Sequence, residues 1–550
     1  PYRRQRQMCI RDRSDTEKSA SSNNKFLKGT LILTVSSIVV KVIGSLNWII
    51  LSRVLGGEGI GLYQMGFPIY LMAITLSSAG IPVAISIITA EKLAQKDFLG
   101  AKRVFNVSLR LLFVTGLVFA SALFFGAHWL IDNHWIRDSR AYYSIIALAP
   151  AVFFVTFLAS FRGYLQGWQI MTPTAASEIV EQLMRVVTMI VFANMFMPHG
   201  LAYAAGGASM GAGVGAFCAL LVLMWFYGRL KQKLKADLQQ QNPLATRESA
   251  RAIISRLMRL ALPVSMSSLM LPVVANLDLL IVPQRLEAAG FHISQATEFF
   301  GYLTGMAVPL INLATIFTAA MTISLVPAIS ESRALNDVFG IRAKTRTAFR
   351  VALIITCPCF VGMYFLAEKI AALIYNAPGA ADAIQTMSVG ILLLGLHQIS
   401  TGILQGLGRT SIPVINMILA AAVKVFLSWT LTAIPTLGIK GAAMATVVDF
   451  GLAAVLNMIF IYKYTGFALS FSGVFKPAVS AAAMGAAVYG VITLAVSWGA
   501  WAILAAIAVA VPVYGGVLLA VGGMGKDDLE SLPFIGHRLL AAGQKLGYFR

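Results

Sequence analysis

The sequence predicts an all-α polytopic membrane protein with about fourteen transmembrane helices. Of its 550 residues, 58% are hydrophobic and 12% are charged, whereas soluble globular proteins carry about 25% charged residues. The mean hydropathy is +0.77. Apolar runs of about 20 residues, the length that crosses a bilayer as a helix, recur between short charged or Pro/Gly-containing breaks.

The first 22 residues differ from the rest of the chain. Residues 1–22 hold six Lys or Arg and three Asp or Glu, and they contain no apolar core of signal-peptide length. We therefore expect a non-native or disordered leader here.

Fourteen apolar runs follow the leader. An even number of spans puts both ends of the chain on one side of the membrane. The runs are centred near Val39, Leu76, Phe113, Phe153, Thr188, Ala212, Met270, Asn312, Thr356, Leu393, Met417, Phe450, Ala487 and Ala510.

The charges between the runs predict which side is cytoplasmic, because cytoplasmic loops carry an excess of Lys and Arg. One set of alternate loops is rich in both, above all at residues 229–251 and 342–346, and Arg162 is counted in this set. The other set holds little beyond Arg53, Arg137, Arg140, Arg285, Lys369 and Lys440. Both termini are therefore expected in the cytoplasm. The formal charge of +20 is expected to reflect topology, with no nucleic acid as a partner.

Short motifs recur in the same order on the two sides of a polar break at residues 231–255. Residues 65–68 (Met-Gly-Phe-Pro) recur as 306–309 (Met-Ala-Val-Pro), and residues 163–167 (Gly-Tyr-Leu-Gln-Gly) recur as 402–406 (Gly-Ile-Leu-Gln-Gly). Each copy holds six runs, so the copies share one orientation. This is the parallel-repeat plan of transporters, in which the substrate lies between the halves.

The repeat defines the expected domains, two pseudo-symmetric lobes and a C-terminal helix pair. The alignment of the lobes places Arg185 opposite Lys424. The expected boundaries are 25–230 for the first lobe, 231–255 for a cytoplasmic linker, 256–465 for the second lobe, 474–522 for the helix pair and 523–550 for a cytoplasmic tail.

Six stretches carry a family resemblance. They are residues 28–30 (Lys-Gly-Thr), 55–65 (Leu-Gly-Gly-Glu-Gly-Ile-Gly-Leu-Tyr-Gln-Met), 162–167 (Arg-Gly-Tyr-Leu-Gln-Gly), 171–174 (Met-Thr-Pro-Thr), 301–306 (Gly-Tyr-Leu-Thr-Gly-Met) and 325–331 (Leu-Val-Pro-Ala-Ile-Ser-Glu). Over essentially all of residues 25–545, the chain resembles the stage V sporulation protein B family. That family lies in the polysaccharide-export branch of the multidrug, oligosaccharidyl-lipid and polysaccharide flippase superfamily. The related lipid II flippases carry an Arg-Asp pair where this chain has Asn47-Trp48.

The resemblance implies export of undecaprenyl-diphosphate-linked peptidoglycan or polysaccharide precursors, from the cytoplasmic to the outer leaflet, by alternating access of two lobes. It implies a location in the bacterial plasma membrane. The expected partners are the lipid-linked anionic precursor, membrane lipids and cell-wall synthesis enzymes. A cation-coupled multidrug antiporter of the same fold is the main alternative, and a structural partner of the cell-wall machinery is another.

Few charged residues lie inside the apolar runs. An ionised side chain at the bilayer centre costs at least about 2.5 kcal/mol, so each should face a cavity or a partner. Glu178, Glu181 and Arg185 stand at helix positions i, i+3 and i+7, which puts all three on one face. The carboxylates and the guanidinium can pair with each other on this face, in which case the face only packs against a neighbouring helix. Together with Lys41 and Lys424, Arg185 can instead line a positive cavity for a diphosphate, which desolvated cations bind through strong charge-assisted hydrogen bonds.

The predicted substrate-binding residues are Lys41, Arg53, Glu178, Glu181, Arg185 and Lys424. Arg53 either acts at the exit of the pathway or snorkels to the interface. Asp278 and Asp449 are candidates for coupling transport to protons or sodium ions, because an isolated acid at that depth titrates readily. Each is equally well explained as a counter-ion to a lysine.

The sequence holds no motif for catalysis, a cofactor or a metal. Residues 522–526 (Gly-Gly-Met-Gly-Lys) lack the spacing and the Ser or Thr of a phosphate-binding loop. The four cysteines lack the spacing of a zinc site or of a disulfide framework. We therefore expect a transporter that is not an enzyme and that needs no cofactor.

Overall fold

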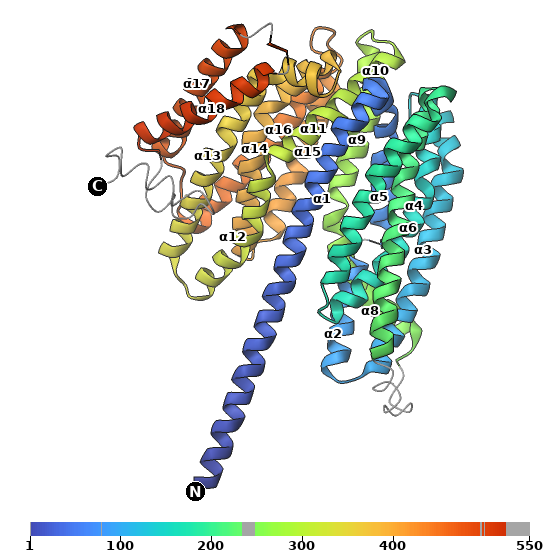
Figure 1. Cartoon of the computed structure of the whole chain (residues 1–550), viewed down its shortest axis with the longest axis vertical. Coiled ribbons are helices and arrows are strands. Elements are labelled where there is room, and N and C mark those ends of the chain that lie inside the picture. Colours follow the sequence, from blue (N-terminus) through green and yellow to red (C-terminus); the bar gives the residue numbers. More distant parts are fainter. Residues whose placement is uncertain (1, 79, 234–247, 495–497, 500, 524–550) are drawn as a thin grey trace. The chain divides into compact units, whose positions relative to one another are not determined.

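The computed structural model describes residues 2–78, 80–233, 248–494, 498–499 and 501–523, apart from the side chains of 2–31, 34 and 267. Every regular element in these ranges is a helix, and the predicted class of all-α polytopic membrane protein is confirmed (Figure 1). The side chains of the expected leader, residues 234–247 of the expected linker and residues 524–550 of the expected tail lie outside this description.

Eleven helices in the described residues are long and apolar enough to cross a membrane, and two bent helix pairs raise the number to 13. The bent pairs are Ala250–Met266 with Met270–Ala288, and Ile293–Ala314 with Ile316–Ala334. Val35–Ala94 has 60 residues, about three times the length that one span needs. Gly56, at φ 67° and ψ −178°, breaks the helical geometry inside it. The count of fourteen therefore stays a prediction, and the described residues show 11 to 13 candidate spans.

The chain divides into two units. The first comprises Pro1–Asn47, Met65–His134 and Arg140–Val273. Within it α3 packs on α4, α4 and α5 pack on α6, and α2 packs on α4 and α8. Its helices are α1 (Tyr2–Ser78, shared with the second unit), α2 (Ile81–Ala94), α3 (Phe98–Asp132), α4 (Tyr142–Gly167), α5 (Thr172–Phe196), η2 (Met197–His199), α6 (Leu201–Lys233) and α8 (Ala250–Ser268).

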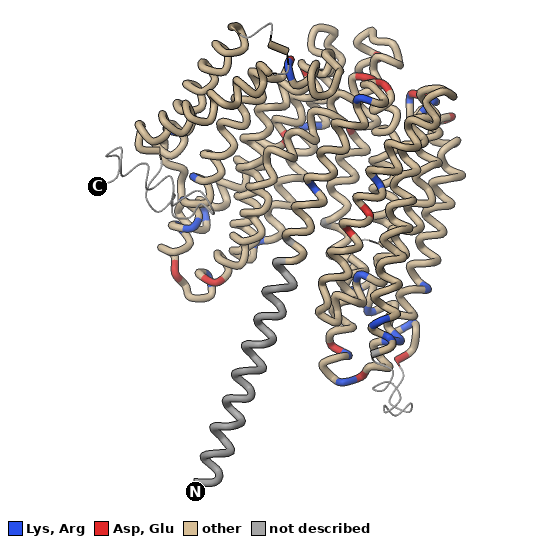
Figure 2. The backbone as a smooth tube through the Cα atoms, in the orientation of Figure 1, with Lys and Arg blue, Asp and Glu red and all other residues tan. Residues whose placement is uncertain are grey.

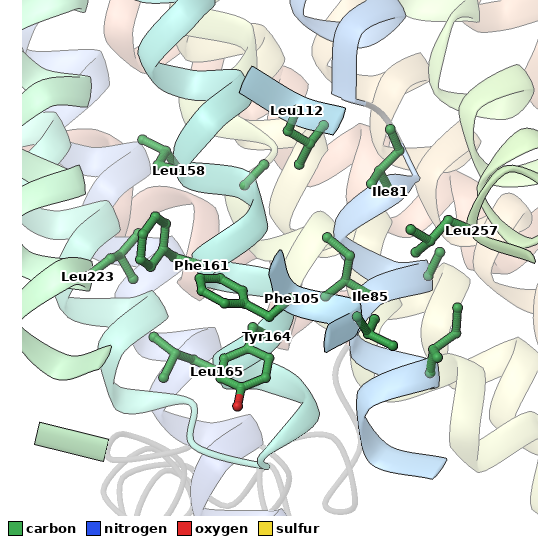
Figure 3. Close-up of a cluster of buried hydrophobic side chains, with 14 of the residues drawn as sticks. Ile81, Ile85, Phe105, Leu112, Leu158, Phe161, Tyr164, Leu165, Leu223 and Leu257 are labelled. Carbon is green, nitrogen blue, oxygen red and sulfur yellow. The ribbon is translucent and has the colours of Figure 1, made fainter. Parts of the chain in front are cut away.

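Aromatic and aliphatic side chains of α2, α3, α4, α6 and α8 form the core of the first unit (Figure 3). The Phe105 ring centroid lies 4.6 Å from that of Tyr164 and 5.2 Å from that of Phe161. Gly163 allows α4 to approach α2 closely, because a Cβ atom at this position would overlap the backbone of Pro82. The first glycine of the repeated motif is therefore a packing residue.

The second unit comprises Trp48–Gln64, Trp135–Ser139 and Val274–Arg550. Within it α14 packs on α12, α13 and α16, and α17 packs on α13 and α18. Its elements are α9 (Met270–Ala288), α10 (Ile293–Gly301), η3 (Tyr302–Ala307), α11 (Val308–Ala314), α12 (Ile316–Ala334), α13 (Val338–Lys369), η4 (Ile370–Ile374), η5 (Pro378–Ala380), α14 (Ala381–Gly406), α15 (Ser411–Leu431), α16 (Ile439–Thr465), α17 (Phe471–Leu494) and α18 (Trp501–Ala520), with η1 (Ser139–Ala141) at the boundary of the units.

The two units share local structural details. Gly402 lies against Thr322 of α12 as Gly163 lies against α2. The first turns of α3 and α13 are capped alike: the Asp97 carboxylate accepts a hydrogen bond from the backbone N–H of Gly100 at 2.7 Å, and Asp337 accepts one from that of Gly340 at 2.8 Å. These matched packing and capping residues support the internal repeat.

Lys, Arg, Asp and Glu gather near the ends of the helices, and few lie along their middle portions (Figure 2). This distribution follows from the cost of placing a charge in the hydrocarbon layer. The charged residues that do lie inside the helices are therefore the starting point for the functional site.

Candidate functional site

The first unit holds a half-buried group of three charged side chains, Arg162, Glu181 and Arg185, which we call the arginine cluster. Arg162 Nη2 of α4 lies 2.9 Å from Glu181 Oε2 of α5, and Arg185 Nη2 lies 2.8 Å from Glu181 Oε1. The three side chains are only 14–18% exposed. One carboxylate thus binds two guanidinium groups, one on each of its oxygens.

Local structure explains how this arginine cluster forms. Glu181 and Arg185 are four residues apart on α5 and therefore share a helix face. Arg162 is near the end of α4, Glu181 is near the start of α5, and only a short connection separates the helices. Arg162 Nε also donates to Ser177 Oγ at 3.1 Å, which fixes the guanidinium against α5.

Arg162 is a member of this site that the sequence analysis used only as a topology signal. It was counted among the cytoplasmic charges, and the structure places it near the end of α4 in an ion pair with Glu181. Its place at the head of the repeated motif, 19 residues before Glu181, is the signal that could have marked it as a candidate site residue.

Two neighbouring helices complete the surroundings of the arginine cluster. The side chain of Tyr70 on α1, which is buried, hydrogen-bonds to that of Arg185. Gly215 of α6 lies directly on the backbone of α5, since a Cβ atom there would overlap the Glu181 carbonyl. Glu178 is half-buried and lies one turn before Glu181. The Glu178–Glu181–Arg185 face predicted from the sequence is thus present, with Arg162 added to it.

Lys41 lies on the face of α1 that meets α5. Three residues after it, Gly44 lies against the Gln182 side chain, and Asn47 Nδ2 lies 3.6 Å from Met189 Sγ. Both contacts advance together along the two helices, so α1 and α5 run parallel here. Lys41 is exposed and has no ion pair with any described residue.

The second unit holds a separate group, Asp278, Lys424 and Asp449, which we call the lysine cluster. Lys424 Nζ of α15 lies 2.6 Å from Asp278 Oδ2 of α9, and the lysine side chain is 5% exposed. Asp449 of α16 is buried beside both of them, and its Oδ1 atom accepts no hydrogen bond from the described residues. The structure therefore brings together both predicted ion-coupling acids and one predicted cation.

The position that matches Arg162 in the repeat is Thr401. It belongs to an uncharged network, in which Asn457 Nδ2 donates to Thr401 Oγ1 at 3.1 Å and Asn416 Nδ2 donates to Asn457 Oδ1 at 2.8 Å. The α4–α5 link of the first unit is ionic, whereas the α14–α15 link runs through amides and hydroxyls. The repeat is therefore chemically asymmetric at this level.

Arg53 binds backbone in this structure. Its Nε donates to the carbonyl of Ile374 at 2.7 Å, and its Nη2 donates to that of Leu373. These carbonyls end the π-helical turn η4, where cations stabilise unpaired acceptors. Arg53 would therefore have to give up its hydrogen bonds to the η4 carbonyls before it could bind a substrate.

The Gly-rich stretch at residues 55–65 has a packing role. A Cβ atom at Gly61 would overlap the Thr297 carbonyl of α10, and one at Gly57 would overlap the Tyr302 ring. Thr297 in turn donates to Asp138 Oδ2 at 2.9 Å. The glycines therefore allow close approach of backbone segments. Among the described residues, no group of three His, Cys, Asp or Glu could hold a metal ion.

Comparison with known proteins identifies the family. The profile of the family described as "Polysaccharide biosynthesis protein" matches residues 26–333, and the profile named MatE matches residues 304–430. Stage V sporulation protein B of Bacillus subtilis (strain 168) is 30% identical over 522 residues, which are 94% of this chain and 99% of that protein.

Two further comparisons concern lipid II flippases. Lipid II flippase MurJ of Bacillus subtilis (strain 168) is 23% identical over 460 residues, or 81% of this chain and 84% of that protein. A solved structure, described as lipid II flippase MurJ in an inward closed conformation, superposes with a TM-score of 0.65 at 13% identity, covering 88% of this chain and 98% of that chain. The chain thus belongs to the polysaccharide biosynthesis protein family of the flippase superfamily, whose members are membrane transporters and not enzymes.

Proposed function

We propose that this protein is a flippase for undecaprenyl-diphosphate-linked peptidoglycan or polysaccharide precursors. It moves them from the cytoplasmic to the outer leaflet of the bacterial plasma membrane by alternating access, and both of its termini are cytoplasmic. The similarity to stage V sporulation protein B and to lipid II flippase MurJ supports this substrate class. Cell-wall synthesis enzymes supply the lipid-linked precursor and use it after transport.

The observation that carries the proposal is the arginine cluster. A diphosphate is a multiply charged anion, and guanidinium groups bind phosphate oxygens through paired, charge-assisted hydrogen bonds. Arg162 and Arg185 both pair with Glu181, and with Lys41 included three cations stand against two carboxylates, Glu178 and Glu181, which suits an anionic headgroup. Glu181 holds the guanidinium groups of Arg162 and Arg185 in place while the site is empty. The phosphate of the substrate competes with Glu181 for the N–H donors of these two groups.

Lys41 and Glu178 extend this site along the α1–α5 interface. Lys41 adds a cation that is exposed and free to approach an anion, and it lies three residues before Gly44, which contacts Gln182 of α5. Glu178 binds hydroxyl or amide groups of the sugar, because a carboxylate accepts hydrogen bonds from such donors. Arg53, three residues before the break in α1 at Gly56, releases the carbonyls of Leu373 and Ile374 to bind the substrate at the exit.

The lysine cluster couples transport of the lipid-linked precursor to the binding of a proton or a sodium ion. Lys424 forms an ion pair with Asp278 when no anion is present, and it turns to the diphosphate when Asp278 or Asp449 is neutralised by a proton or a sodium ion. Breaking a buried pair without such compensation costs about 3–5 kcal/mol. The membrane potential adds about 2.3 kcal/mol per charge per 100 mV toward outward movement of an anion.

Reconstitution tests the proposal. The purified protein is inserted into vesicles with a fluorescent lipid-linked oligosaccharide, and its exposure to an external reducing quencher is followed over time. Translocation of the diphosphate-linked lipid is expected, with much slower movement of a neutral glycolipid that carries the same sugar and chain. Equal rates for the two lipids would contradict the anionic-headgroup site.

A cation-coupled multidrug antiporter is the second candidate. The MatE match at residues 304–430 and the two acids of the lysine cluster favour it. The same vesicles distinguish the two functions, because an antiporter exports cationic dyes in response to an imposed proton or sodium gradient. Dye export without movement of the lipid-linked sugar would favour the antiporter.

A further inference from the structure

A positively charged cavity lies between α13 and the C-terminal helix pair, and none of its lining residues belongs to either cluster described above. It measures about 250 Å³. Arg346, Arg350 and Lys476 line it, together with the hydroxyl-bearing Ser470 and Ser472. No Asp or Glu is among the described residues of its wall.

The walls of this cavity are held in place by hydrogen bonds. Arg350 Nη2 donates to the Gly523 carbonyl at 3.0 Å, and Lys476 Nζ donates to the Gly522 carbonyl at 2.9 Å, which joins α13 and α17 to the end of α18. Arg346 lies one turn before Arg350, is exposed and makes no hydrogen bond or ion pair with the described residues. Its charge is therefore available to an anion.

An apolar groove of about 380 Å³ shares a wall with the charged cavity. Phe467 and Leu469 of the α16–α17 connection line both, and the Phe349 and Phe467 rings stack with centroids 5.9 Å apart. The rest of the groove includes Val455 and Ile459 of α16, which are 48% and 56% exposed. An acyl chain of the surrounding bilayer suits such a surface.

We infer that the charged cavity and this groove together bind an anionic glycerophospholipid of the surrounding membrane. Its phosphate binds Arg346, Arg350 and Lys476, and one acyl chain lies in the groove along α16. Charge complementarity and the shared wall favour this occupant, since basic pockets between membrane helices at the cytoplasmic side bind anionic headgroups. The bound lipid would fasten α17 and α18 to α13. The inference does not depend on the proposed flippase activity.

Native mass spectrometry of the full chain tests the inference. The purified protein is titrated with phosphatidylglycerol and with phosphatidylcholine of the same acyl chains, and the retained lipid is counted. Several-fold preferential retention of phosphatidylglycerol is expected. Arg346→Gln should weaken it about fivefold, the effect of one Lys or Arg near an anionic surface. Lys463→Gln is the matched control, because Lys463 is an exposed cation near the end of α16 that lines neither cavity nor groove.

A second variant tests the acyl-chain groove. Val455→Trp should weaken binding of long-chain phosphatidylglycerol and leave binding of the dihexanoyl form unchanged. Equal retention of the two headgroups, or equal effects of Arg346→Gln and Lys463→Gln, would overturn the inference. Saturation by glycerol phosphate alone would mean that the site takes a free anion. If a preference emerges only after Asp527, Asp528 and Glu530 are all neutralised, these three carboxylates are the occupant, and the inference is wrong.

Discussion

Arg162 on α4 forms an ion pair with Glu181 on α5 across 2.9 Å, and both side chains are less than one-fifth exposed. The pair joins two consecutive helices, and either charge would be expensive to leave alone when buried to this degree. Because Glu181 also binds Arg185, it orients two cations at once. The arginine cluster is therefore both a stabilising link and the proposed contact for a phosphate, and separate measurements can address the two roles.

Arg162→Gln should destabilise the first unit. It removes one of the two cations bound to Glu181, and losing one partner of a buried ion pair costs about 3–5 kcal/mol, with the lower end expected here because Arg185 remains. The melting temperature of the purified protein should fall clearly. Arg110→Gln, at an exposed arginine of α3, is the control and should leave it nearly unchanged. Equal melting temperatures for the two variants would show that the pair contributes nothing measurable.

Arg185→Ala and Lys424→Ala should each abolish complementation of a flippase-deficient strain. The first removes a cation of the arginine cluster, and the second removes the cation of the lysine cluster. Arg185→Lys, which keeps the charge, should retain part of the activity. Membrane levels of each variant are measured by immunoblot. Full complementation by both alanine variants would refute the role of these cations in transport.

Asp449→Asn should separate coupling from folding. The Asp449 Oδ1 atom accepts no hydrogen bond from the described residues, so the amide should fit with a stability change below about 1 kcal/mol. Asp278→Asn leaves Lys424 without its carboxylate partner and should be more destabilising. If Asp449 titrates during transport, its amide variant loses the response of flipping rate to pH or to sodium in vesicles. An unchanged response would exclude Asp449 as the coupling residue.

Topology is predicted from the loop charges. Lys231 and Lys344 are expected on the cytoplasmic side, and Arg137 and Lys369 on the outside. Single cysteines at these positions, in a chain whose four native cysteines are replaced, are treated with an impermeant maleimide in intact cells. Positions 137 and 369 should react, and positions 231 and 344 should react only after lysis. Labelling at 231 in intact cells would reverse the orientation.

The helix pair α17 and α18 is predicted to form a groove in which the polyprenyl tail of the carrier lies. A long tail must stay in an apolar phase, because each CH₂ exposed to water costs about 0.8 kcal/mol. Ala483→Trp, at a half-buried position of α17, should slow flipping of long-chain carriers more than that of short-chain analogues. Gly485→Trp is the contrast, since Gly485 packs on Val361 of α13 and a bulky residue there should impair folding. Equal slowing of both carriers by Ala483→Trp would show that α17 and α18 have only a structural role.

Truncation after Lys476 tests the same helix pair. It should leave a membrane-inserted protein of twelve helices that does not transport long-chain carriers.

The amino-acid sequence by itself determined the membrane class, the positions of the spans and the short list of intramembrane charges. Each of these depends on a local property, the transfer free energy of about 20 consecutive residues, which can be read without knowing what the segment contacts. All fourteen predicted centres lie in helices, and the Glu178–Glu181–Arg185 face is present because helical periodicity fixes it.

Only the tertiary structure decided which charges meet. Lys424 and Asp278 are separated by 146 residues, and nothing in the spacing of either marks the other as its partner. Arg162 was not among the predicted site residues, because a cation near the end of an apolar run satisfies the topology rule whether or not an acid on the next helix binds it. Arg53 likewise caps η4, which is more than 300 residues away. Ion pairs depend on which helix faces come within about 4 Å of each other, and that distance is a property of packing.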